Sequence, residues 1–306
     1  MYRKILYVTA FEKFYQDVLS CALSLKKAGA EEVVLLHVIY STQLPKSHEE
    51  YVLKLAETLR NLLSDRMDEA AALVEAAGMK VKKRIELGVP YQEILRVAKE
   101  ENVSLIVAGR ERKGFLDEVF VGSITDKIIR HGTTPVYIPK YPGTYGADRE
   151  TCEAFSRNPF RLILYPTDWS DCAREALDYV KQFKTAGVEE VIVAHIMDEK
   201  AMKLQPEEKF REFERIDEEK LAEVKKQLEK EGLKVSTRLC VGNPRTALIT
   251  LAKTADVSLI IMGTHGKGRT EGILWGSVSR NVAEYSERPV LLIKGGKCIS
   301  GGKTTA

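Results

Sequence analysis

The chain has 306 residues, of which 44% are hydrophobic and 30% are charged, and its formal net charge is +3. A chain of this length suggests two domains, each large enough to bury its own core. No apolar run approaches the roughly 18 residues of a membrane-spanning helix, and so small a net charge gives no electrostatic case for binding nucleic acid or membranes. We therefore expect a soluble globular protein that binds neither nucleic acid nor membranes.

The first residues, MYRKILYVTAF, contain a short apolar run that Glu12 and Lys13 interrupt, and no small-residue cleavage site follows. This stretch therefore predicts a first strand and not a signal peptide. The five cysteines are widely spaced and form no CxxC pair: Cys21, Cys152, Cys172, Cys240 and Cys298. This pattern favours free thiols in a reducing compartment, so we expect a cytoplasmic protein.

An internal repeat spans the chain. Residues 102–109 (NVSLIVAG) return as residues 256–263 (DVSLIIMG), 154 positions later. Upstream, residues 35–39 (LLHVI) match residues 193–197 (VAHIM), 158 positions later, so the second copy lacks four residues between its second and third strands. A repeat of this length indicates two domains of the same fold.

The repeat sets the expected domain boundaries. We expect one domain at residues 1–140 and another at residues 161–295, joined by a Pro- and Gly-containing linker at residues 141–160. Residues 296–306 are expected to form a flexible tail. The tail ends in GKT, but Lys297 stands where a phosphate-binding loop needs its first glycine, and no helix follows.

In each copy, apolar strand patterns alternate with helical patterns. In the second copy, the expected strands are residues 161–167, 191–197, 234–242, 257–263 and 290–294. The expected helices are residues 171–183, a long charged segment with apolar positions from 210 to 228, residues 244–254, and a segment from 276 to 288. Apolar strands that alternate with helices predict the α/β class, with a parallel sheet covered on both faces. We expect the polar face of the long charged helix to be solvated.

Residues 165–170 (YPTDWS) stand at the end of the first strand of the second copy. Pro166 cannot donate to a sheet ladder, which suits the point where a strand ends. Asp168 then falls in the turn before the helix, with Ser170 as a candidate N-cap. Two interpretations of Asp168 are open: a turn or cap residue, or a ligand-binding carboxylate, because ligands of such sheets bind at the carboxyl ends of the strands.

A glycine-rich loop, GTHGKGRTEGILWGSVS at residues 263–279, follows the fourth strand. It fits neither the dinucleotide-binding fingerprint nor the Walker-type loop. Gly263 permits a sharp exit from the strand. Gly266 and Gly268 permit positive φ angles and a close approach of the backbone to a ligand.

Gly276 and Ser277 begin the helix after this loop, where N–H groups without helical partners and the helix dipole favour an anion. Ser277 has two roles open to it, a bond to a phosphate oxygen or the capping of its own helix. Lys267 and Arg269 lie in the loop, where they meet either phosphate charge or only solvent. Physical chemistry alone leaves a nucleotide site and a flexible turn equally supported.

The histidines give little support for catalysis. His37 and His195 stand at equivalent positions in the second strands, and we expect both to be hydrogen-bonded and at least half-buried. His265 lies inside the candidate site without an evident carboxylate partner, and Trp275 is expected to pack. The cysteines and histidines have no metal-ligand spacing, so Mg²⁺ is expected only with nucleotide phosphates, and no catalytic residue is assigned.

The pattern GTHG, nine residues, then GS resembles the nucleotide-binding branch of the universal stress protein family, as do PTDWS and AHIMD at the ends of the first two strands. The resemblance covers essentially the whole chain as a tandem pair. It implies two five-stranded, Rossmann-like domains of the adenine nucleotide alpha hydrolase type, in a pseudo-twofold arrangement. It also implies that ATP or AMP binds between strands one and four, at Pro166, Thr167, Asp168, Ile196, Met262, Gly263, Gly266, Lys267, Gly268, Arg269, Gly276, Ser277, Val278 and Ser279.

Within this set the resemblance places Asp168 and Ile196 at the adenosine end. The first copy departs from the pattern, because Ala10 stands where Asp168 stands and Arg112 replaces the glycine at position 266. Residues 122–123 (GS) keep the helix start and the loop is basic, which leaves weak anion binding open there. We predict that the second copy holds the nucleotide.

The lead hypothesis is a cytoplasmic stress-response protein that binds an adenine nucleotide and signals or buffers through its bound state. The alternative is a slow ATP hydrolase or an adenylate-forming enzyme on the same fold. Related enzymes that cleave ATP between its α- and β-phosphates carry a Ser-Gly-Gly loop where this chain has PTDWSD, and no activated nucleophile is evident. A third alternative is an assembly module that binds nothing.

The family's dimers form through their fifth strands. This implies antiparallel pairing of residues 135–138 with residues 289–293 inside one chain, as a pseudo-twofold dimer. A further homodimer of whole chains is also compatible with the sequence.

Overall fold

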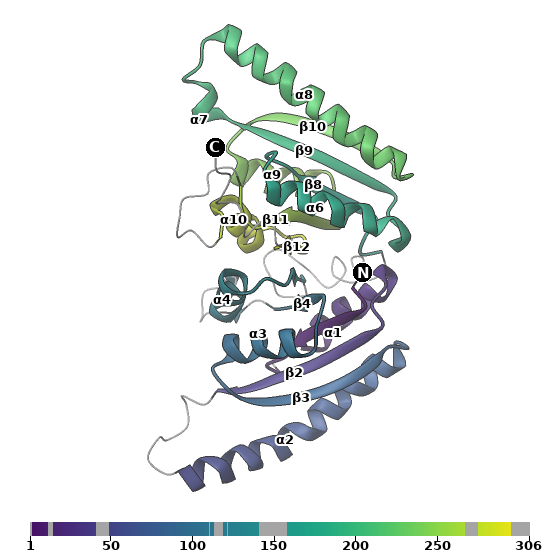
Figure 1. The fold of residues 1–306 in the computed structure, drawn as a ribbon, viewed down its shortest axis with the longest axis vertical. Helices are drawn as coiled ribbons and strands as arrows, with labels where there is room; N and C mark the ends of the chain where they lie inside the picture. Colours follow the sequence, from purple (N-terminus) through teal and green to yellow (C-terminus); the bar gives the residue numbers. More distant parts are fainter. Residues whose placement is uncertain are drawn as a thin grey trace, which may run out of the picture.

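The computed structural model of the protein describes residues 2–11, 15–40, 49–109, 111–112, 119–120, 122–140, 158–266 and 275–294. The first half of the chain alternates strands and helices (Figure 1). Its elements are β1 (Lys4–Val8), α1 (Tyr15–Leu23), the 3₁₀ helix η1 (Ser24–Ala28), β2 (Glu32–Tyr40), α2 (Glu49–Ala76), β3 (Lys80–Gly88), α3 (Pro90–Glu100), β4 (Leu105–Val107), a short hairpin of β5 (Glu111–Arg112) and β6 (Val119–Phe120), α4 (Ser123–His131) and β7 (Val136–Ile138).

The second half repeats this order. Its elements are β8 (Leu162–Pro166), α6 (Asp171–Gln182), η3 (Phe183–Ala186), β9 (Glu190–Asp198), the short helix α7 (Glu199–Met202), α8 (Glu207–Lys230), β10 (Val235–Gly242), α9 (Pro244–Thr254), β11 (Leu259–Gly263), α10 (Ser277–Tyr285) and β12 (Val290–Ile293). Pro244 is the first residue of α9, where its missing N–H has no helical partner to lose. The expected helix at residues 244–254 is therefore confirmed.

The repeat extends to unusual backbone angles. Positive φ angles in the described chain occur as matched pairs in the two halves, at Phe11 and Trp169, Asn102 and Asp256, Gly29 and Gly187, and Gly78 and Gly232. A side chain with a β-carbon rarely adopts a positive φ angle. The four non-glycine residues thus indicate turns whose geometry both copies keep.

One sheet of ten strands runs through both halves, in the order β10-β9-β8-β11-β12-β7-β4-β1-β2-β3. Within each half the neighbouring strands are parallel, and at the centre β12 pairs with β7 antiparallel, with Val290 opposite Ile138. The fifth strands of the two halves therefore pair antiparallel, as the resemblance to the family implies. The long helices α2 and α8 lie at the two far ends of the molecule (Figure 1).

Helices cover both faces of this sheet. Successive residues of a strand point to opposite faces, so Ile5 and Tyr7 pack in one core layer and Leu6 in the other. The first layer contains buried residues of α1, α2, α6 and α8, and the second contains buried residues of α3, α4, α9 and α10. The α/β class with two tandem five-stranded domains is confirmed.

The linker expected at residues 141–160 lies mostly outside the described residues, and so does the tail expected at residues 296–306. Phe160, at the end of that linker, is fully buried, and its ring centroid lies 5.0 Å from that of Phe183. The packed core of the second domain therefore includes a residue that the sequence assigns to the linker.

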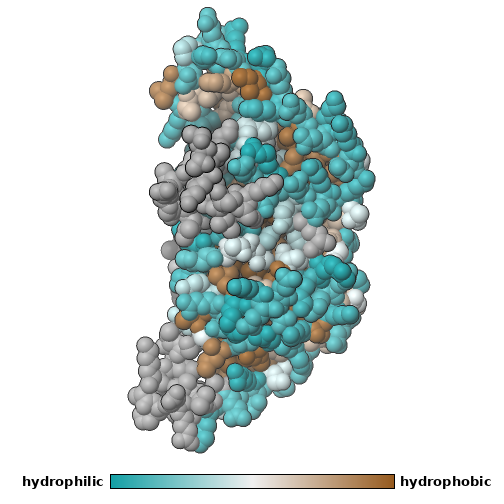
Figure 2. All heavy atoms as spheres, viewed as in Figure 1, coloured by the Kyte–Doolittle hydropathy of each residue, from teal (hydrophilic) through white to brown (hydrophobic). Residues whose placement is uncertain are grey.

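The face of the molecule in Figure 2 is mostly hydrophilic, with small, separate hydrophobic patches. The most exposed large hydrophobic side chains of the described chain are Leu204, which is 82% exposed, and Leu62, which is 67% exposed. Among the helices of the described ranges, none is both long and apolar enough to cross a membrane.

Candidate functional site

A cavity of about 840 Å³ lies at the carboxyl ends of β8, β9 and β11 in the second domain. It brings together two segments about 100 positions apart in sequence, the turn after β8 and the loop after β11. All of the predicted site residues that the structure describes line this cavity: Pro166, Thr167, Asp168, Ile196, Met262, Gly263, Gly266, Gly276, Ser277, Val278 and Ser279. Lys267, Gly268 and Arg269 lie outside the described residues.

The turn after β8 is held at its backbone. Pro166 is the last residue of β8, as the sequence predicts. Trp169 has a φ angle of 65°, in the left-handed region. Its N–H donates to Oγ1 of Thr167 (3.1 Å), and its carbonyl oxygen accepts from Nη1 of Arg174 (2.6 Å). These bonds offset the strain of a left-handed residue that is not glycine.

Asp168 closes this turn and also lines the cavity. Its Oδ1 atom accepts hydrogen bonds from the backbone N–H of Ser170 (3.1 Å) and from the Ser170 hydroxyl (2.6 Å). Ser170 is the N-cap of α6, because its Oγ atom accepts from the backbone N–H of Ala173 (3.2 Å). The two interpretations of Asp168 are thus compatible, since one oxygen serves the turn while the residue borders the cavity.

The three glycines of the loop that the structure describes are required for space and not for backbone angle. None of Gly263, Gly266 and Gly276 has a positive φ, so the freedom of angle that glycine permits is not used at Gly266. A β-carbon at position 263 would lie 2.8 Å from the β-carbon of Cys172 on α6. At position 276 it would lie 3.0 Å from the carbonyl oxygen of Thr264. Each glycine therefore permits a close approach of neighbouring protein atoms.

The two ends of the glycine-rich loop meet at Thr264. Its carbonyl oxygen accepts from the backbone N–H of Gly276 (2.8 Å) and from the hydroxyl of Ser279 (2.8 Å). Gly276 is the N-cap of α10 and Ser277 is the first helical residue, without a side-chain capping bond in this helix. Of the two roles open to Ser277, the structure thus leaves capping unfilled. The Ser279 hydroxyl, by contrast, already donates within the loop.

The long helix α8 supplies a wall of the cavity that the sequence analysis missed. Asp217 lines the cavity, and its side chain is 14% exposed. Its carboxylate accepts from Nε1 of Trp169 (2.8 Å) and lies 3.2 Å from Nε2 of His195. Lys220, one turn along, places its ammonium 3.6 Å from the same carboxylate and 5.5 Å from the centre of the Trp169 ring. The polar face of α8 was expected to be solvated, but part of it, at Asp217 and Lys220, lines the cavity.

His195 is half-buried and hydrogen-bonded, as expected. Its Nδ1 atom lies 2.7 Å from the carbonyl oxygen of Thr167, and its Nε2 atom faces Asp217. Both neighbours can accept hydrogen bonds, so the ring is held between the turn after β8 and the helix α8.

The first domain lacks the acidic groups of this site. Ala10 stands in place of Asp168, and Phe11, whose φ angle is 54°, stands in place of Trp169. The Phe11 ring stacks on His37, with ring centroids 5.4 Å apart, and burial lowers the pKa of His37. Leu63 occupies the α2 position that corresponds to Asp217, 154 positions earlier. The first domain thus keeps the turn and the histidine without the carboxylates.

The expectation of free thiols is wrong for one cysteine. Cys172, at the start of α6 beneath Gly263, is disulfide-bonded. Cys240 on β10 is a free thiol, and Cys21 donates its thiol to the carbonyl oxygen of Lys140 (3.4 Å). Trp275 is buried, as expected. The spacing of the cysteines in the sequence gave no signal of this bond.

Comparison with known proteins relates both halves of the chain to one family. The family model described as "Universal stress protein family" matches residues 1–140 and residues 159–294. The universal stress protein MJ0577 of Methanocaldococcus jannaschii is 39% identical over 154 residues, which cover 44% of this chain and 95% of that protein. A universal stress protein of Mycolicibacterium smegmatis is 23% identical over 271 residues, which cover 86% of this chain and 87% of that protein.

A solved structure of similar size supports the same conclusion. The crystal structure of a universal stress protein from Archaeoglobus fulgidus DSM 4304 aligns with a TM-score of 0.72 at 25% sequence identity. The alignment covers 96% of each chain, so the tandem arrangement of two domains is shared. With two family matches that together span most of its length, this chain belongs to the universal stress protein family.

Proposed function

We propose that the second domain binds an adenine nucleotide and that the protein acts in stress response through its nucleotide-bound state. One observation carries the proposal: the Asp168 turn, both ends of the glycine-rich loop and the start of α10 border a single cavity. In an open parallel sheet, the crevice at the carboxyl ends of the strands is where such ligands bind. A volume of about 840 Å³ lies within the range of ligand pockets.

The phosphates belong at the end of the cavity formed by Gly263, Gly276 and Ser277. The first N–H groups of α10 have no partners inside the helix, and the helix dipole adds positive potential at that point. The Ser277 hydroxyl, which does not cap the helix, is placed to bond a phosphate oxygen. Mg²⁺ would enter with ATP, held by phosphate oxygens, and is not needed for AMP.

The adenosine belongs at the other end. Ile196, Met202, Phe213 and Leu248 give this end an apolar lining suited to a base. Asp168 is the carboxylate at this end that accepts hydrogen bonds from ribose hydroxyls, the role that an acidic residue has in related nucleotide folds. ATP and AMP share the adenosine, so this end of the cavity is compatible with both.

The role is binding and not hydrolysis. The ring of His195 lies between the Thr167 carbonyl oxygen and the Asp217 carboxylate, contacts that give it a positional role in the cavity wall. The first domain, with Ala10 and Leu63 at the key positions, contributes the other half of a pseudo-twofold dimer within one chain. We infer that the second domain carries the ligand and the first stabilises it.

The first test is the mass spectrum of small molecules released from the purified protein by denaturation. We expect ATP, ADP or AMP at a ratio of about one per chain, because one domain carries the complete set of residues. A second test is calorimetric titration with ATP and with AMP. Protein that neither carries nor binds an adenine nucleotide in both measurements would rule out the proposed function.

The assignment of the ribose contact is tested with Asp168→Ala. Loss of a hydrogen bond to a charged group lowers affinity by about tenfold or more. The matched control is Asp171→Ala, which removes an exposed carboxylate on the same helix start without changing the cavity. We expect the control to bind as the unmodified protein does, so an equal loss in both variants would contradict the assignment.

A further inference from the structure

Gly266 and Asp168 lie against each other in the lining of the cavity. A β-carbon built on Gly266 would overlap the Oδ2 atom of Asp168 and would lie 3.5 Å from its Cγ atom. The φ angle of Gly266 lies outside the left-handed region, so another residue could adopt this backbone. What the position requires is the absence of a side chain, because the Asp168 carboxylate fills that space.

Asp168 has little freedom to move away from such a side chain. Its Oδ1 atom is bonded to the N–H and the hydroxyl of Ser170, and the next residue, Trp169, is fixed by bonds from its N–H, its carbonyl oxygen and its indole. Rotating the carboxylate to clear a β-carbon would break one or both bonds to Ser170. A side chain at position 266 therefore acts first on the orientation of Asp168.

The two halves of the chain differ at both positions together. The first domain has Ala10 in place of Asp168 and Arg112 in place of Gly266. The copy that lacks the carboxylate in sequence thus also lacks the glycine.

We propose that Gly266 is a positioning residue, which keeps open the space in which Asp168 presents its Oδ2 atom to the ligand. This inference rests on the proposed function, since it assigns how the adenosine end of that site is built. It differs from the usual role of a glycine in a phosphate loop, which is to let the backbone approach the phosphates. The two roles predict different results when Gly266 and Asp168 are substituted together and the affinity for the ligand is measured.

The test is a double-mutant cycle of Asp168→Ala and Gly266→Ala, with the affinity for ATP and for AMP measured by calorimetry. Each single variant is expected to lower affinity about tenfold or more, because each removes the same hydrogen bond. The double variant is expected to bind as Asp168→Ala does, with no further loss. If Gly266→Ala lowers affinity by the same factor in both backgrounds, the glycine serves the ligand directly and the inference is overturned.

A glycine of the same domain outside the cavity lining provides the control. At Gly242 a β-carbon would lie 3.9 Å from its nearest neighbour, an ordinary contact, so Gly242→Ala is expected to leave affinity unchanged. A loss in this variant as large as that of Gly266→Ala would show that any added methyl group has this effect, and would overturn the positioning role.

A measurement without nucleotide separates this inference from the proposed function. Hydrogen exchange of the Ser170 amide reports its bond to Asp168. Gly266→Ala and Asp168→Ala are each expected to raise the exchange rate, and the double variant is expected to exchange no faster than Asp168→Ala. Unchanged Ser170 exchange in Gly266→Ala would overturn the inference. If the protein binds no nucleotide but this pattern appears, only the proposed function fails.

Discussion

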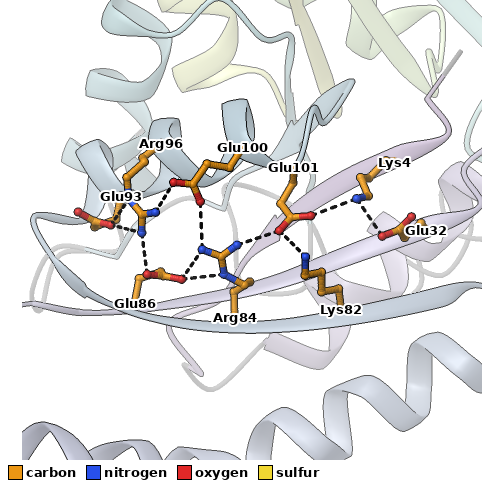
Figure 3. A network of polar contacts seen from close by, with 9 residues as sticks. All are labelled: Lys4, Glu32, Lys82, Arg84, Glu86, Glu93, Arg96, Glu100 and Glu101. Atoms are coloured by element: carbon orange, nitrogen blue, oxygen red, sulfur yellow. Dashed lines mark hydrogen bonds and ion pairs between the residues drawn. The ribbon is translucent and has the colours of Figure 1, made fainter.

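Glu101 follows directly after α3, is only 9% exposed, and pairs with Lys82, Lys4 and Arg84 (Figure 3). Hydrogen bonds from these three cations, with that from Lys82 the largest contribution, hold the pKa of the Glu101 carboxyl at about 2. Because the pKa is depressed in the folded state, the stabilisation is fully present above the ordinary value of 4.5 and is lost as the pH falls through about 2. Glu101 is thus a residue whose contribution depends on pH.

Glu101→Gln is expected to lower the stability of the first domain by on the order of 1 kcal/mol at pH 7, since Lys4 and Lys82 are partly screened by solvent. The loss is expected to shrink between pH 5 and pH 3. Thermal unfolding followed by circular dichroism at several pH values measures it. Both tryptophans lie in the second domain, so their fluorescence transition should not move. A loss of the same size at pH 3 and pH 7 would contradict the prediction.

At the residue scale, the sequence predicted the contacts that are local. Ser170 caps the helix that starts at the next residue, so its role is readable from the order of residues. Asp217 was missed because its partner Trp169 is 48 positions away and the surrounding helix is rich in charge. One signal was present: the first copy has Leu63 at the corresponding position, so an acidic residue replaces an apolar one in a repeated helix. Gly266 lines the cavity as predicted, but its close approach to Asp168 was not predicted, because a glycine's neighbours in space are not visible in sequence.

At the element scale, one carboxylate on α8, that of Asp217, connects this helix to the other residues around the cavity. Asp217 accepts the indole N–H of Trp169 and faces His195, while Leu221 and Leu228 bury the apolar side of the same helix. The position of α8, and with it the wall formed by Phe213, depends on a polar contact as well as on apolar packing. In the first domain, α2 has no such carboxylate at position 63.

Asp217→Leu writes the residue of the first domain into the second. It leaves the Trp169 indole and the His195 ring without their acceptor, and an unsatisfied buried donor costs about 1–3 kcal/mol. We expect lower thermal stability of the second domain and a changed emission of Trp169. The control is Glu219→Leu, which removes an exposed ion pair on the same helix and is expected to alter stability by less than about 0.5 kcal/mol. Equal melting temperatures for Asp217→Leu and the unmodified protein would contradict this role of α8.

The first and last residues of helices and strands were predicted best where a proline stands at the boundary. The helix α9 begins at Pro244, and β8 ends at Pro166, as the sequence predicts. The short hairpin of β5 and β6 was not predicted, because two-residue strands carry no periodicity. The order of the strands in the sheet was not predicted from pattern, since register and neighbours are set by tertiary contacts; the resemblance to the family implied only the pairing of the fifth strands.

At the scale of the whole molecule, the pseudo-twofold contact is not symmetric in charge. Asp126 on α4 and Arg280 on α10 stand at equivalent positions of the two copies, and their side chains lie 3.9 Å apart across the boundary between the halves. Two first domains, or two second domains, would bring like charges together at this point. Opposite charges at equivalent positions therefore favour pairing of unlike halves over pairing of like halves.

A lysine joins the same two halves close to the sheet. Lys294, which follows β12, is 6% exposed, and its ammonium donates to the carbonyl oxygens of Ile129 and Arg130 at the end of α4. The carbonyl oxygens at the end of a helix have no helical partners and carry negative potential, so a donor from the other domain satisfies them. Burial nevertheless lowers the pKa of Lys294 to about 8, from an ordinary value of 10.5.

The depressed pKa predicts that the contribution of Lys294 to the unfolding free energy increases as the pH rises. A lysine that is harder to charge in the folded state contributes its full stability above pH 10.5, and that contribution is lost as the pH falls through about 8. The neutral amine keeps two N–H groups, enough for both carbonyl oxygens, so it does not need the charge to bridge the halves. We expect the unfolding free energy of the unmodified protein, relative to Lys294→Met, to rise by on the order of 1 kcal/mol between pH 7.5 and pH 10. Denaturant unfolding of both proteins in parallel measures this difference, because the other titrating groups are common to the two. A difference that stays constant, or that falls with pH, would mean that the Lys294 ammonium is no harder to charge at this boundary than in the unfolded chain.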